Sequence, residues 1–325
     1  LCQDPAVPPS ELRDGSAADF GAGAPDAGAY VTRSLAGEVL LTPKVVGEFT
    51  GDALPEGWTV QPWVEGGTAT LEGGMLVLDG AMVSCEPLLL SPRSVEISAV
   101  FAARPDQLAG LGVDFVKEPW VMFSTKWGRR MYGRTHLLQI EDRKLSPDWF
   151  GAPHVFRIDW NVLDIIFSVD GAPQAQLMIP VPGYMRPLAA NQRLGTEPLR
   201  IEWMRLSPYA PAGRFTSRVF DAGAPSTWHA LTWEAGVPAA TSLTLQVRTG
   251  DAARPGAGWS SWRRLARSGD PVGATSRYLQ YRAHLATTNP SWTPALRQVR
   301  VSYAEASPAG SSSSSLGATN VLGCQ

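Results

Sequence analysis

The sequence predicts an all-β protein built from two tandem antiparallel β-sandwiches. Short apolar runs alternate with turn residues along most of the 325-residue chain, which contains 32 Gly and 27 Pro. No long segment shows the 3.6-residue period of an amphipathic helix, so we expect little helix. The length agrees with about two domains of roughly 150 residues each. Hydrophobic residues make up 44% of the chain, which is enough for a real core.

Composition excludes several other classes of protein. The net charge is −2, and we expect no nucleic-acid partner because phosphate binding usually shows as a basic excess. No apolar run approaches the roughly 18 residues that cross a bilayer, so we expect no membrane span. The chain begins at Leu1 with no visible signal peptide. We expect the mature, processed product of a secreted or cell-surface protein, and a trimmed chain is the alternative.

Changes in composition divide the chain into four segments. Residues 1–29 are rich in Ala, Gly, Pro and Asp and predict an extended N-terminal arm with no core of its own. Residues 30–208 predict the first sandwich. The break SPYAPAG precedes the second sandwich, at 209–304, where six strand-like runs are separated by Gly, Pro, Asp or Asn. Residues 305–325 contain five consecutive serines and predict a Ser/Gly-rich C-terminal tail.

Turn signals and alternation place strands in the first sandwich. Gly73-Gly74 lies between TATL and MLVLDG, and Asp170-Gly171 follows IIFSV. Both pairs are signals for tight hairpins. In FRIDW, period-two alternation puts Phe156, Ile158 and Trp160 on one face of a strand.

The run LRIEWMRL at 199–206 predicts the closing strand of that sandwich. Alternation in this strand predicts one face with Leu199, Ile201, Trp203 and Arg205, and an opposite face with Arg200, Glu202 and Met204. We expect Trp160 and Trp203 to lie in the core.

The stretch from about 48 to 208 resembles a concanavalin A-like sandwich, of the laminin-G and family 16 glycoside hydrolase group. The resemblance is carried by GEFTGDALPEGWTV (47–60), LGVDF (111–115), PHVFRIDWNVLDIIFSVDG (153–171) and PLRIEWMRLSPY (198–209). It covers about half of the chain and implies a jelly roll. The second half resembles a sandwich module of secreted bacterial proteins, through FTSRVFDAG (215–223), WSSW (259–262), RYLQYRAHL (277–285) and TPALRQVRVSY (293–303).

The retaining enzymes of that group carry Glu-x-Asp-x-x-Glu on one strand, and they need two carboxyl groups about 5–5.5 Å apart. The motif is absent here. The nearest run, EISAVF, keeps Glu96 but has Ser98 and Phe101 in the other two places. Glu141 and Asp142 are adjacent, so on a strand they face opposite sides. We expect no enzymatic activity, and a glycoside hydrolase is the remaining alternative.

Other catalytic and metal-binding signatures are also absent from the sequence. It has no Gly-x-Ser-x-Gly elbow, no His-Glu-x-x-His, no Cys-x-x-Cys and no phosphate loop. The four histidines are scattered, and we interpret them as structural: His136, His154, His229 and His284.

We expect no cofactor, with Ca²⁺ as the one candidate. Asp159 and Asp170 could supply carboxylate oxygens to a hard cation. The alternative is that Asp170 is a turn residue and Asp159 a solvated strand residue. The lack of any loop with dense alternating acids favours that alternative.

The three cysteines are Cys2, Cys85 and Cys324. One bridge is predicted, either between Cys2 and Cys324 or between one of these and Cys85, with one thiol left over. Three unrelated thiols are the alternative, because sequence alone does not give connectivity.

The stretch STKWGRRMYGRTH is both basic and aromatic, and we expect it to contact a glycan or another acidic surface. Flat rings stack on sugars while polar neighbours supply hydrogen bonds. The alternative is a solvated hairpin whose Trp covers the edge of the sandwich. The candidate glycan-binding residues are Trp120, Trp127, Arg129, Arg130, Tyr132 and Arg134.

Two functions follow from these observations. The first is a non-enzymatic secreted structural or adhesive protein, a subunit of a filament-like surface assembly. Its terminal arms would pair with the exposed sheet edge of a neighbouring copy. The second is a monomeric polysaccharide-binding module. The sequence slightly favours assembly, and the two functions are not exclusive.

Overall fold

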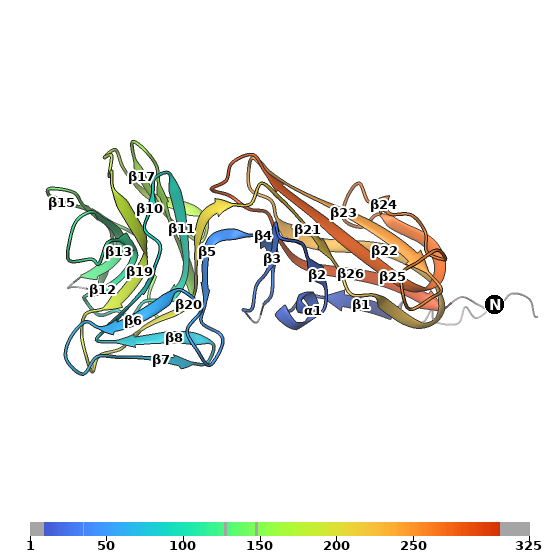
Figure 1. The fold of residues 1–325 in the computed structure, drawn as a ribbon, viewed down its shortest axis with the longest axis horizontal. Helices are drawn as coiled ribbons and strands as arrows, with labels where there is room; N and C mark the ends of the chain where they lie inside the picture. Colours follow the sequence, from blue (N-terminus) through green and yellow to red (C-terminus); the bar gives the residue numbers. More distant parts are fainter. Residues whose placement is uncertain (1–9, 35, 127–128, 147–148, 306–325) are drawn as a thin grey trace, which may run out of the picture.

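The computed structural model describes residues 10–34, 36–126, 129–146 and 149–305. These residues form three β-sheets and one short helix, which confirms the all-β prediction. No described helix is long and apolar enough to span a membrane. The sheets form two units that follow one another along the long axis of the molecule (Figure 1).

Sheets I and II face each other and form the jelly-roll sandwich. In sheet I, strand β5 (Pro43–Glu48) pairs with β20, and the other strands follow the order β18 (Ala172–Leu177), β17 (Ile165–Val169), β16 (His154–Trp160), β11 (Arg93–Val100), β20 (Leu199–Tyr209), β8 (Met75–Asp79) and β7 (Thr68–Glu72). In sheet II, strand β10 (Leu89–Leu90) pairs with β19, and the order is β15 (Ile140–Lys144), β14 (Arg130–His136), β13 (Trp120–Lys126), β12 (Gln107–Gly112), β19 (Tyr184–Asn191), β9 (Ala81–Cys85) and β6 (Trp58–Pro62).

Aromatic rings join the two sheets across the core of the sandwich. Phe123 of β13 contacts Phe156 of β16 and Phe167 of β17, with ring centroids 5.1 and 5.2 Å apart. Edge-to-face pairs at such spacings add to the stabilisation from burial. Phe156, Ile158 and Trp160 are all fully buried, so the alternation predicted for this strand is confirmed.

Both predicted hairpin turns are present. Gly73 and Gly74 have positive φ between β7 and β8, and Asp170 and Gly171 have positive φ between β17 and β18. Two consecutive residues with positive φ give the backbone twist that matches antiparallel strands.

A bulge in β20 overturns the predicted face of Trp203 and Arg205. Ser98 of β11 pairs with Trp203, but the next residue, Ala99, pairs with Ile201, so Glu202 is an extra residue on β20. An extra residue shifts a period-two pattern to the opposite face. Met204 therefore joins the core. Trp203 and Arg205 lie on the outer side of sheet I, where they are buried all the same, at 8% and 5% exposed.

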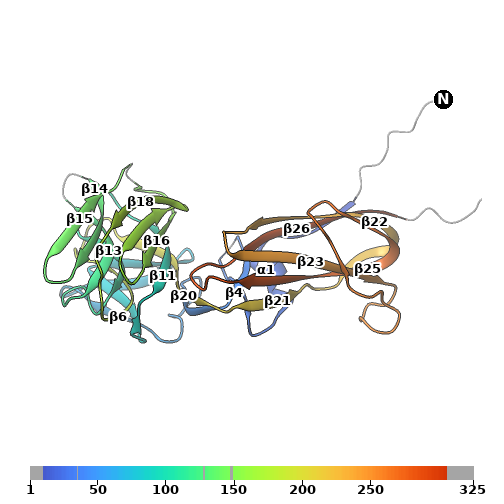
Figure 2. The ribbon, with the colours of Figure 1, turned by 90° about the horizontal axis from the view of Figure 1, so that it is seen from above.

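Sheet III forms the second unit and curls around a core of its own (Figure 2). Its main order is β2 (Ala24–Pro25), β21 (Ala212–Thr216), β25 (Pro271–Thr287), β22 (Phe220–Gly236), β26 (Ala295–Glu305), β4 (Val39–Leu41) and β3 (Ala29–Val31). Strand β1 (Ser10–Asp14) pairs with β26, β23 (Thr241–Gly250) with β25, and β24 (Arg263–Arg264) with β23. The helix α1 (Ala17–Gly21) precedes β2.

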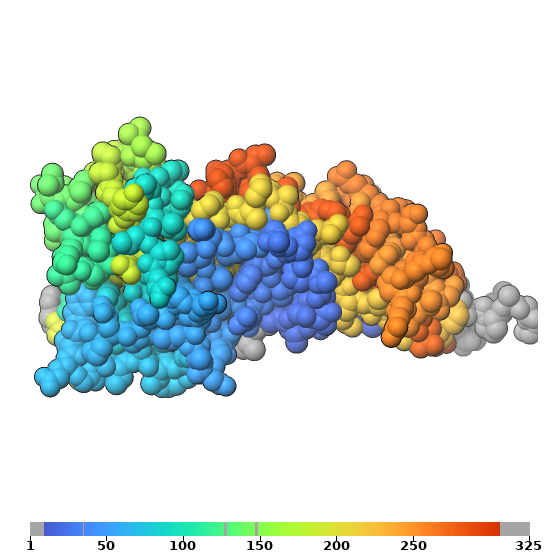
Figure 3. Space-filling model, in the orientation of Figure 1, coloured from blue at the N-terminus to red at the C-terminus, as the bar shows by residue number. Residues whose placement is uncertain are grey.

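The N-terminal segment differs from the predicted arm. Strands β1 to β4 all belong to sheet III, and Phe20 is buried in its core with its ring 5.8 Å from that of Phe215. The Gly-rich composition reflects close packing here, because a Cβ on Gly28 would lie 2.0 Å from the carbonyl oxygen of Ala212. The dark-blue residues accordingly lie against the second unit in Figure 3. Residues 1–9 and 306–325 lie outside the described residues, and Glu305, the first residue of the predicted tail, ends β26.

The jelly roll is therefore an insertion in the sheet III unit. The chain leaves sheet III after β4, builds sheets I and II, and returns through β20 to β21. The first sandwich was expected to begin at residue 30, but β3 and β4 pair with sheet III, and β5 is the first strand of the jelly roll.

A network of buried charges joins the two units at the outer face of sheet I. Arg157 of β16 is 3% exposed. It pairs with Asp159 and, at 3.1 Å, with Glu96, and it donates a 2.8 Å hydrogen bond to the carbonyl of Ser291. Its guanidinium carbon lies 3.6 Å from the ring centroid of Trp292, which like Ser291 belongs to the loop between β25 and β26.

Arg205 makes a parallel set of contacts beside this network. It lies 3.4 Å from Glu38 and 3.7 Å from Glu48, and its guanidinium carbon is 3.8 Å from the ring centroid of Trp203. Glu38 also pairs with Arg297 of β26 at 2.9 Å. These contacts line a cleft of about 400 Å³ between the units, in which each arginine has an acidic partner.

We expect Arg157→Ala to lower the free energy of unfolding by about 3–5 kcal/mol, because Glu96 and Asp159 lose the cation that balances them at a buried site. Chemical denaturation measures the change. Arg267→Ala, whose side chain is 87% exposed, is the control, with an effect within about 0.5 kcal/mol. A loss below about 1 kcal/mol for Arg157→Ala would contradict the importance of this network.

Burial raises the pKa of Glu48 above its ordinary value of 4.5, despite the backbone N–H of Arg33 and the charge of Arg205. Its contribution to stability is therefore complete below its unfolded pKa and is lost as pH rises through the folded pKa. We expect Glu48→Gln to remove this loss. Denaturation midpoints from pH 4 to 7 give the difference between the two proteins, and parallel pH profiles would exclude Glu48 as the group responsible.

Candidate functional site

The outer face of sheet II carries the residues that the sequence singled out. Along each strand, side chains that point into the core alternate with side chains that point to the outer face. The pairing register between strands therefore determines which outward side chains are neighbours. Lys126 pairs with Arg130, Tyr132 with Lys144, and Arg134 with Asp142. The face has two parts, an apolar centre and a basic edge.

The apolar centre is closed by its own side chains. Met122 of β13 is 2% exposed although it lies on the outer face, and Leu188 of β19 is fully buried. They form a second, smaller cluster with Met82, Leu108, Phe115, Trp120 and Ala190, and Trp63 packs against it. Phe115 has a φ of 62° in the segment between β12 and β13. The middle of this face is therefore a small core rather than an open cleft.

The basic edge of sheet II consists of Lys126, Arg130, Tyr132, Arg134 and Lys144. Asp142 accepts hydrogen bonds from Lys126 and, at 2.7 Å, from Arg134. The Nζ of Lys126 lies 5.0 Å from the ring centroid of Tyr132. Arg130 and Lys144 are exposed beside this group. The cations at this edge outnumber their one acidic partner.

Burial alone would raise the pKa of Asp142, but its hydrogen bonds to Lys126 and Arg134, together with their charges, bring that pKa below its ordinary value. Asp142 is therefore ionised at neutral pH. Its pairing fixes the positions of Lys126 and Arg134 on the outer face, and it leaves Arg130 and Lys144 free to contact an external group.

Trp120 supports the edge from beneath and is not a stacking platform. It is 5% exposed, its ring centroid lies 5.2 Å from that of His136, and the guanidinium carbon of Arg134 lies 5.5 Å from it. Arg129 is exposed in the turn after β13. Trp127 lies outside the described residues. The structure thus brings together three predicted residues on one strand face, Arg130, Tyr132 and Arg134.

The basic stretch identified from the sequence contains Lys126, but sequence reasoning missed Lys144 and the contribution of Asp142. The signal that identifies them is the register of two consecutive hairpins, which places each directly opposite a residue of β14. The sequence shows a local excess of basic residues. Such an excess does not indicate which strand pairs with β14.

Carboxylates are sparse on this face. Among the outward positions of the described strands of sheet II, Asp142 is the one acidic residue. Glu96, the first residue of the closest match to the hydrolase motif, lies on sheet I instead. It binds Arg157, and it accepts a 2.8 Å hydrogen bond from Tyr209.

The two candidate calcium ligands have partners within the protein. Asp159 is held by Arg157 and accepts a 2.6 Å hydrogen bond from Ser94, so it is not a solvated strand residue. Asp170 binds Nδ1 of His154 at 2.7 Å and accepts the backbone N–H of Val155. Among the described residues, no three His, Cys, Asp or Glu side chains gather into a metal site.

Cys85 is buried in the jelly-roll core and is free in the described part of the chain. Burial raises the pKa of its thiol to about 12. Cys2 and Cys324 lie outside the described residues, so the pairing of the three cysteines stays a prediction.

The sequence matches no protein-family model. It also matches no curated protein sequence. Solved structures of glycoside hydrolases are similar to about half of the chain. They include a glycosyl hydrolase family protein from Mycobacterium fortuitum, with 15% identity and a TM-score of 0.40 over 51% of this chain and 100% of that one.

Two further matches are glucanases. The endo-β-1,3-glucanase from Pyrococcus furiosus has 13% identity and a TM-score of 0.40, over 56% of this chain and 98% of that one. The β-glucanase of Bacillus licheniformis has 14% identity and a TM-score of 0.38, over 50% of this chain and 96% of that one. The likeness concerns the fold alone.

We expect Met122→Ala to lower the free energy of unfolding by about 2–5 kcal/mol, as for a buried core methionine, because it would leave a cavity in the cluster that closes the outer face. Denaturation with urea measures this change. Tyr132→Ala, on the same face but partly exposed, is the comparison and should cost less. An equal effect of the two substitutions would show that the apolar centre is not packed as described.

Proposed function

We propose that the protein binds an acidic polysaccharide without cleaving it, through the basic edge of sheet II. The observation that carries this proposal is the projection of Arg130, Tyr132 and Arg134 from alternate positions of one strand, with Lys126 and Lys144 opposite them. Arginine and lysine bind carboxylate or sulfate groups by charge-assisted hydrogen bonds. The partly exposed Tyr132 adds apolar contact and a hydroxyl group.

Binding rather than cleavage is proposed because retaining hydrolysis uses two carboxyl groups about 5–5.5 Å apart. The outward positions of the described strands of sheet II supply Asp142 alone. Both of its oxygens are engaged, one by Lys126 and the other by Arg134. A carboxylate held in this way organises cations and is a poor acid or nucleophile. Secretion or display at a cell surface belongs to this proposal.

Self-association through terminal segments comes second to binding. Strand β1 pairs with β26 of its own chain over five residues, from Ser10 opposite Tyr303 to Asp14 opposite Val299. The carboxylate of Asp14 also accepts hydrogen bonds from Tyr281 and Arg218 at 2.9 Å each. Residues 10–14 of the predicted arm thus pair with a strand of their own chain and do not offer a free edge to a neighbouring copy. Assembly into a filament would need the terminal residues outside the described ranges.

We expect the double substitution Arg130→Gln with Lys144→Gln to weaken binding of polygalacturonate roughly five- to tenfold, since two exposed cations are removed without disturbing the Asp142 pairing. Affinity electrophoresis in gels containing the polymer measures the effect. Arg267→Gln removes an exposed cation elsewhere and is the control. Unchanged mobility of the double variant, or release of reducing ends by the unmodified protein, would count against the proposal.

A further inference from the structure

One segment of the second unit is strongly basic. Between residues 237 and 295 the sequence contains seven arginines, no lysine and two acidic residues, Asp251 and Asp270, although the whole chain has a net charge of −2. A local excess of this kind creates a field that attracts anions even when the total charge is close to zero.

The outward side of β21, β23 and β25 gathers much of this charge on one surface, here named the sheet III basic face. Along β25, Tyr281, Ala283 and Leu285 are buried in the core, so Arg282 and His284 point outward. His284 pairs in register with Arg214 of β21, and Arg282 pairs with Gln246 of β23.

Two further arginines complete the face. Arg264 of β24 pairs with Gln246, which places it in the same row as Arg282. Arg248 follows Gln246 by two positions on β23 and therefore points to the same side. The face carries four arginines and one histidine on neighbouring strands.

Two arginines of this face donate to neutral side chains, whereas the buried arginines at the joint between the units pair with carboxylates. Arg248 donates to Oε1 of Gln280 at 3.0 Å, and Arg282 donates to Oε1 of Gln246. The outward strand positions of the described residues on this face include no acid. At its border, Asp26 accepts backbone N–H groups of Gly28 and Arg214, each at 3.0 Å. The charge of Asp26 acts on His284 from this border, and the four arginines of the face outnumber it.

Tryptophan holds two of the cations close together. The ring centroid of Trp262 lies 4.4 Å from the guanidinium carbons of both Arg248 and Arg282. Trp259 lies 5.3 Å from Arg248. Guanidinium groups pack favourably over indole rings, and this packing positions them before any ligand arrives.

Burial and neighbouring positive charges lower the pKa of two groups on this face, Arg248 and His284. Burial and the charge of Arg282 lower the pKa of Arg248. Burial, together with the charges of Arg282 and Arg214, lowers the pKa of His284. An anion placed among these groups would relieve their mutual repulsion.

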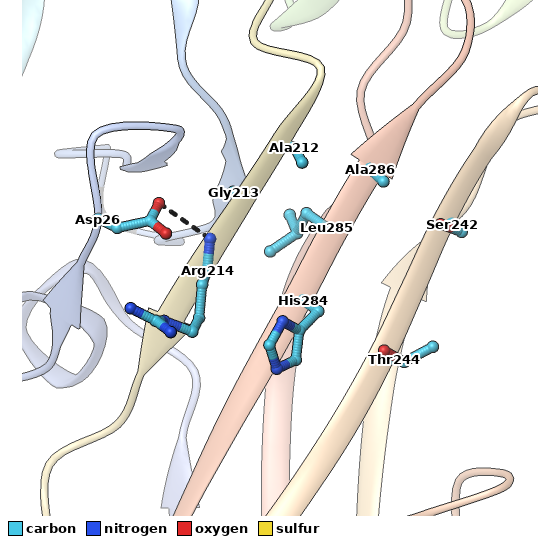
Figure 4. Close-up of a pocket in the computed structure, with 9 residues that line it drawn as sticks. All are labelled: Asp26, Ala212, Gly213, Arg214, Ser242, Thr244, His284, Leu285 and Ala286. Atoms are coloured by element: carbon cyan, nitrogen blue, oxygen red, sulfur yellow. Dashed lines mark hydrogen bonds between the residues drawn. The ribbon is translucent and has the colours of Figure 1, made fainter.

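A shallow hollow of about 350 Å³ adjoins the cations (Figure 4). Its lining includes Arg214, His284 and the carboxylate of Asp26, with the hydroxyl-bearing Ser242 and Thr244 on a neighbouring strand. Hydroxyl and imidazole groups beside a cation match a sugar that carries both hydroxyl and acidic substituents.

We propose that the sheet III basic face binds the carboxylate or sulfate groups of an acidic polysaccharide, at a site separate from the basic edge of sheet II. The proposal does not depend on binding at sheet II. A polysaccharide fits better than a single-stranded nucleic acid because base stacking needs open aromatic rings. Here Trp259 and Trp262 already carry guanidinium groups over their rings.

The decisive variant is Gln246→Glu in the full-length chain. It places a carboxylate where the glutamine oxygen already accepts from Arg282, so it lowers the positive charge of the face while keeping the contact. We expect its unfolding midpoint to be unchanged or raised, and its affinity for a short oligogalacturonate to fall about tenfold. Arg282→Gln and Arg214→Gln should each weaken binding, whereas Arg267→Gln, which lies off the face, should not.

Isothermal titration at fixed salt separates the two proposed sites by stoichiometry. Both proposed sites are supported if Gln246→Glu loses one binding event and the Arg130→Gln and Lys144→Gln double variant loses the other. If Gln246→Glu and Arg282→Gln bind like the unmodified protein while the double variant does not, the inference is overturned and the proposed function stands. The opposite pattern supports the inference and overturns the proposed function.

Two more probes define the ligand. Binding of a sulfated dextran oligosaccharide as well as the oligogalacturonate would show that either acidic group suffices, and preference for one would name the group. Neutral dextran should not bind. Tighter binding of a single-stranded oligonucleotide than of either acidic oligosaccharide, lost in Gln246→Glu, would overturn the choice of polysaccharide and assign the face to nucleic acid.

Discussion

The arrangement of the two units depends on the contacts that the guanidinium group of Arg157 makes across the joint. It occupies an outward position of sheet I that would ordinarily be solvated, yet it is almost fully buried. Its acidic partners come from sheet I, while a carbonyl and an indole ring come from the second unit. A different placement of the units would leave Arg157 with Glu96 and Asp159, but it would remove the hydrogen bond to Ser291 and the packing against Trp292. These two contacts across the joint favour the observed arrangement of the units.

Much of the fold could be predicted from local patterns, and the exceptions have identifiable causes. Alternation correctly placed Phe156, Ile158 and Trp160 in the core, since a regular strand follows period two. It failed for Trp203 because the extra residue Glu202 forms a bulge, which depends on the partner strand rather than on β20 itself. Composition failed for residues 10–29, where glycines serve close backbone contact with β21 and not chain freedom. Both errors concern contacts between residues far apart in the sequence.

The candidate sites show the same division. A basic and aromatic run identified Arg130, Tyr132 and Arg134, but it could not reveal that Trp120 lies beneath Arg134 or that Asp142 holds two cations. Whole-chain charge concealed the sheet III basic face altogether, because acids elsewhere balance its arginines. What distinguishes the arginines is the chemistry of their partners. Those at the joint pair with Glu38, Glu96 or Asp159, whereas Arg248 and Arg282 bind glutamine oxygens and keep their full charge available.

The insertion of the jelly roll gives these surfaces a fixed relation. Because the chain enters and leaves the jelly roll beside the joint, through β5 and β20, the two units are linked by two backbone crossings as well as by the Arg157 network. The basic edge of sheet II lies on the sandwich sheet opposite to the joint, and the sheet III basic face lies on the other unit. A polymer long enough to reach both meets the second surface at an effective concentration set by this rigid separation. The two proposed sites together would then retain a long acidic chain more firmly than either site alone.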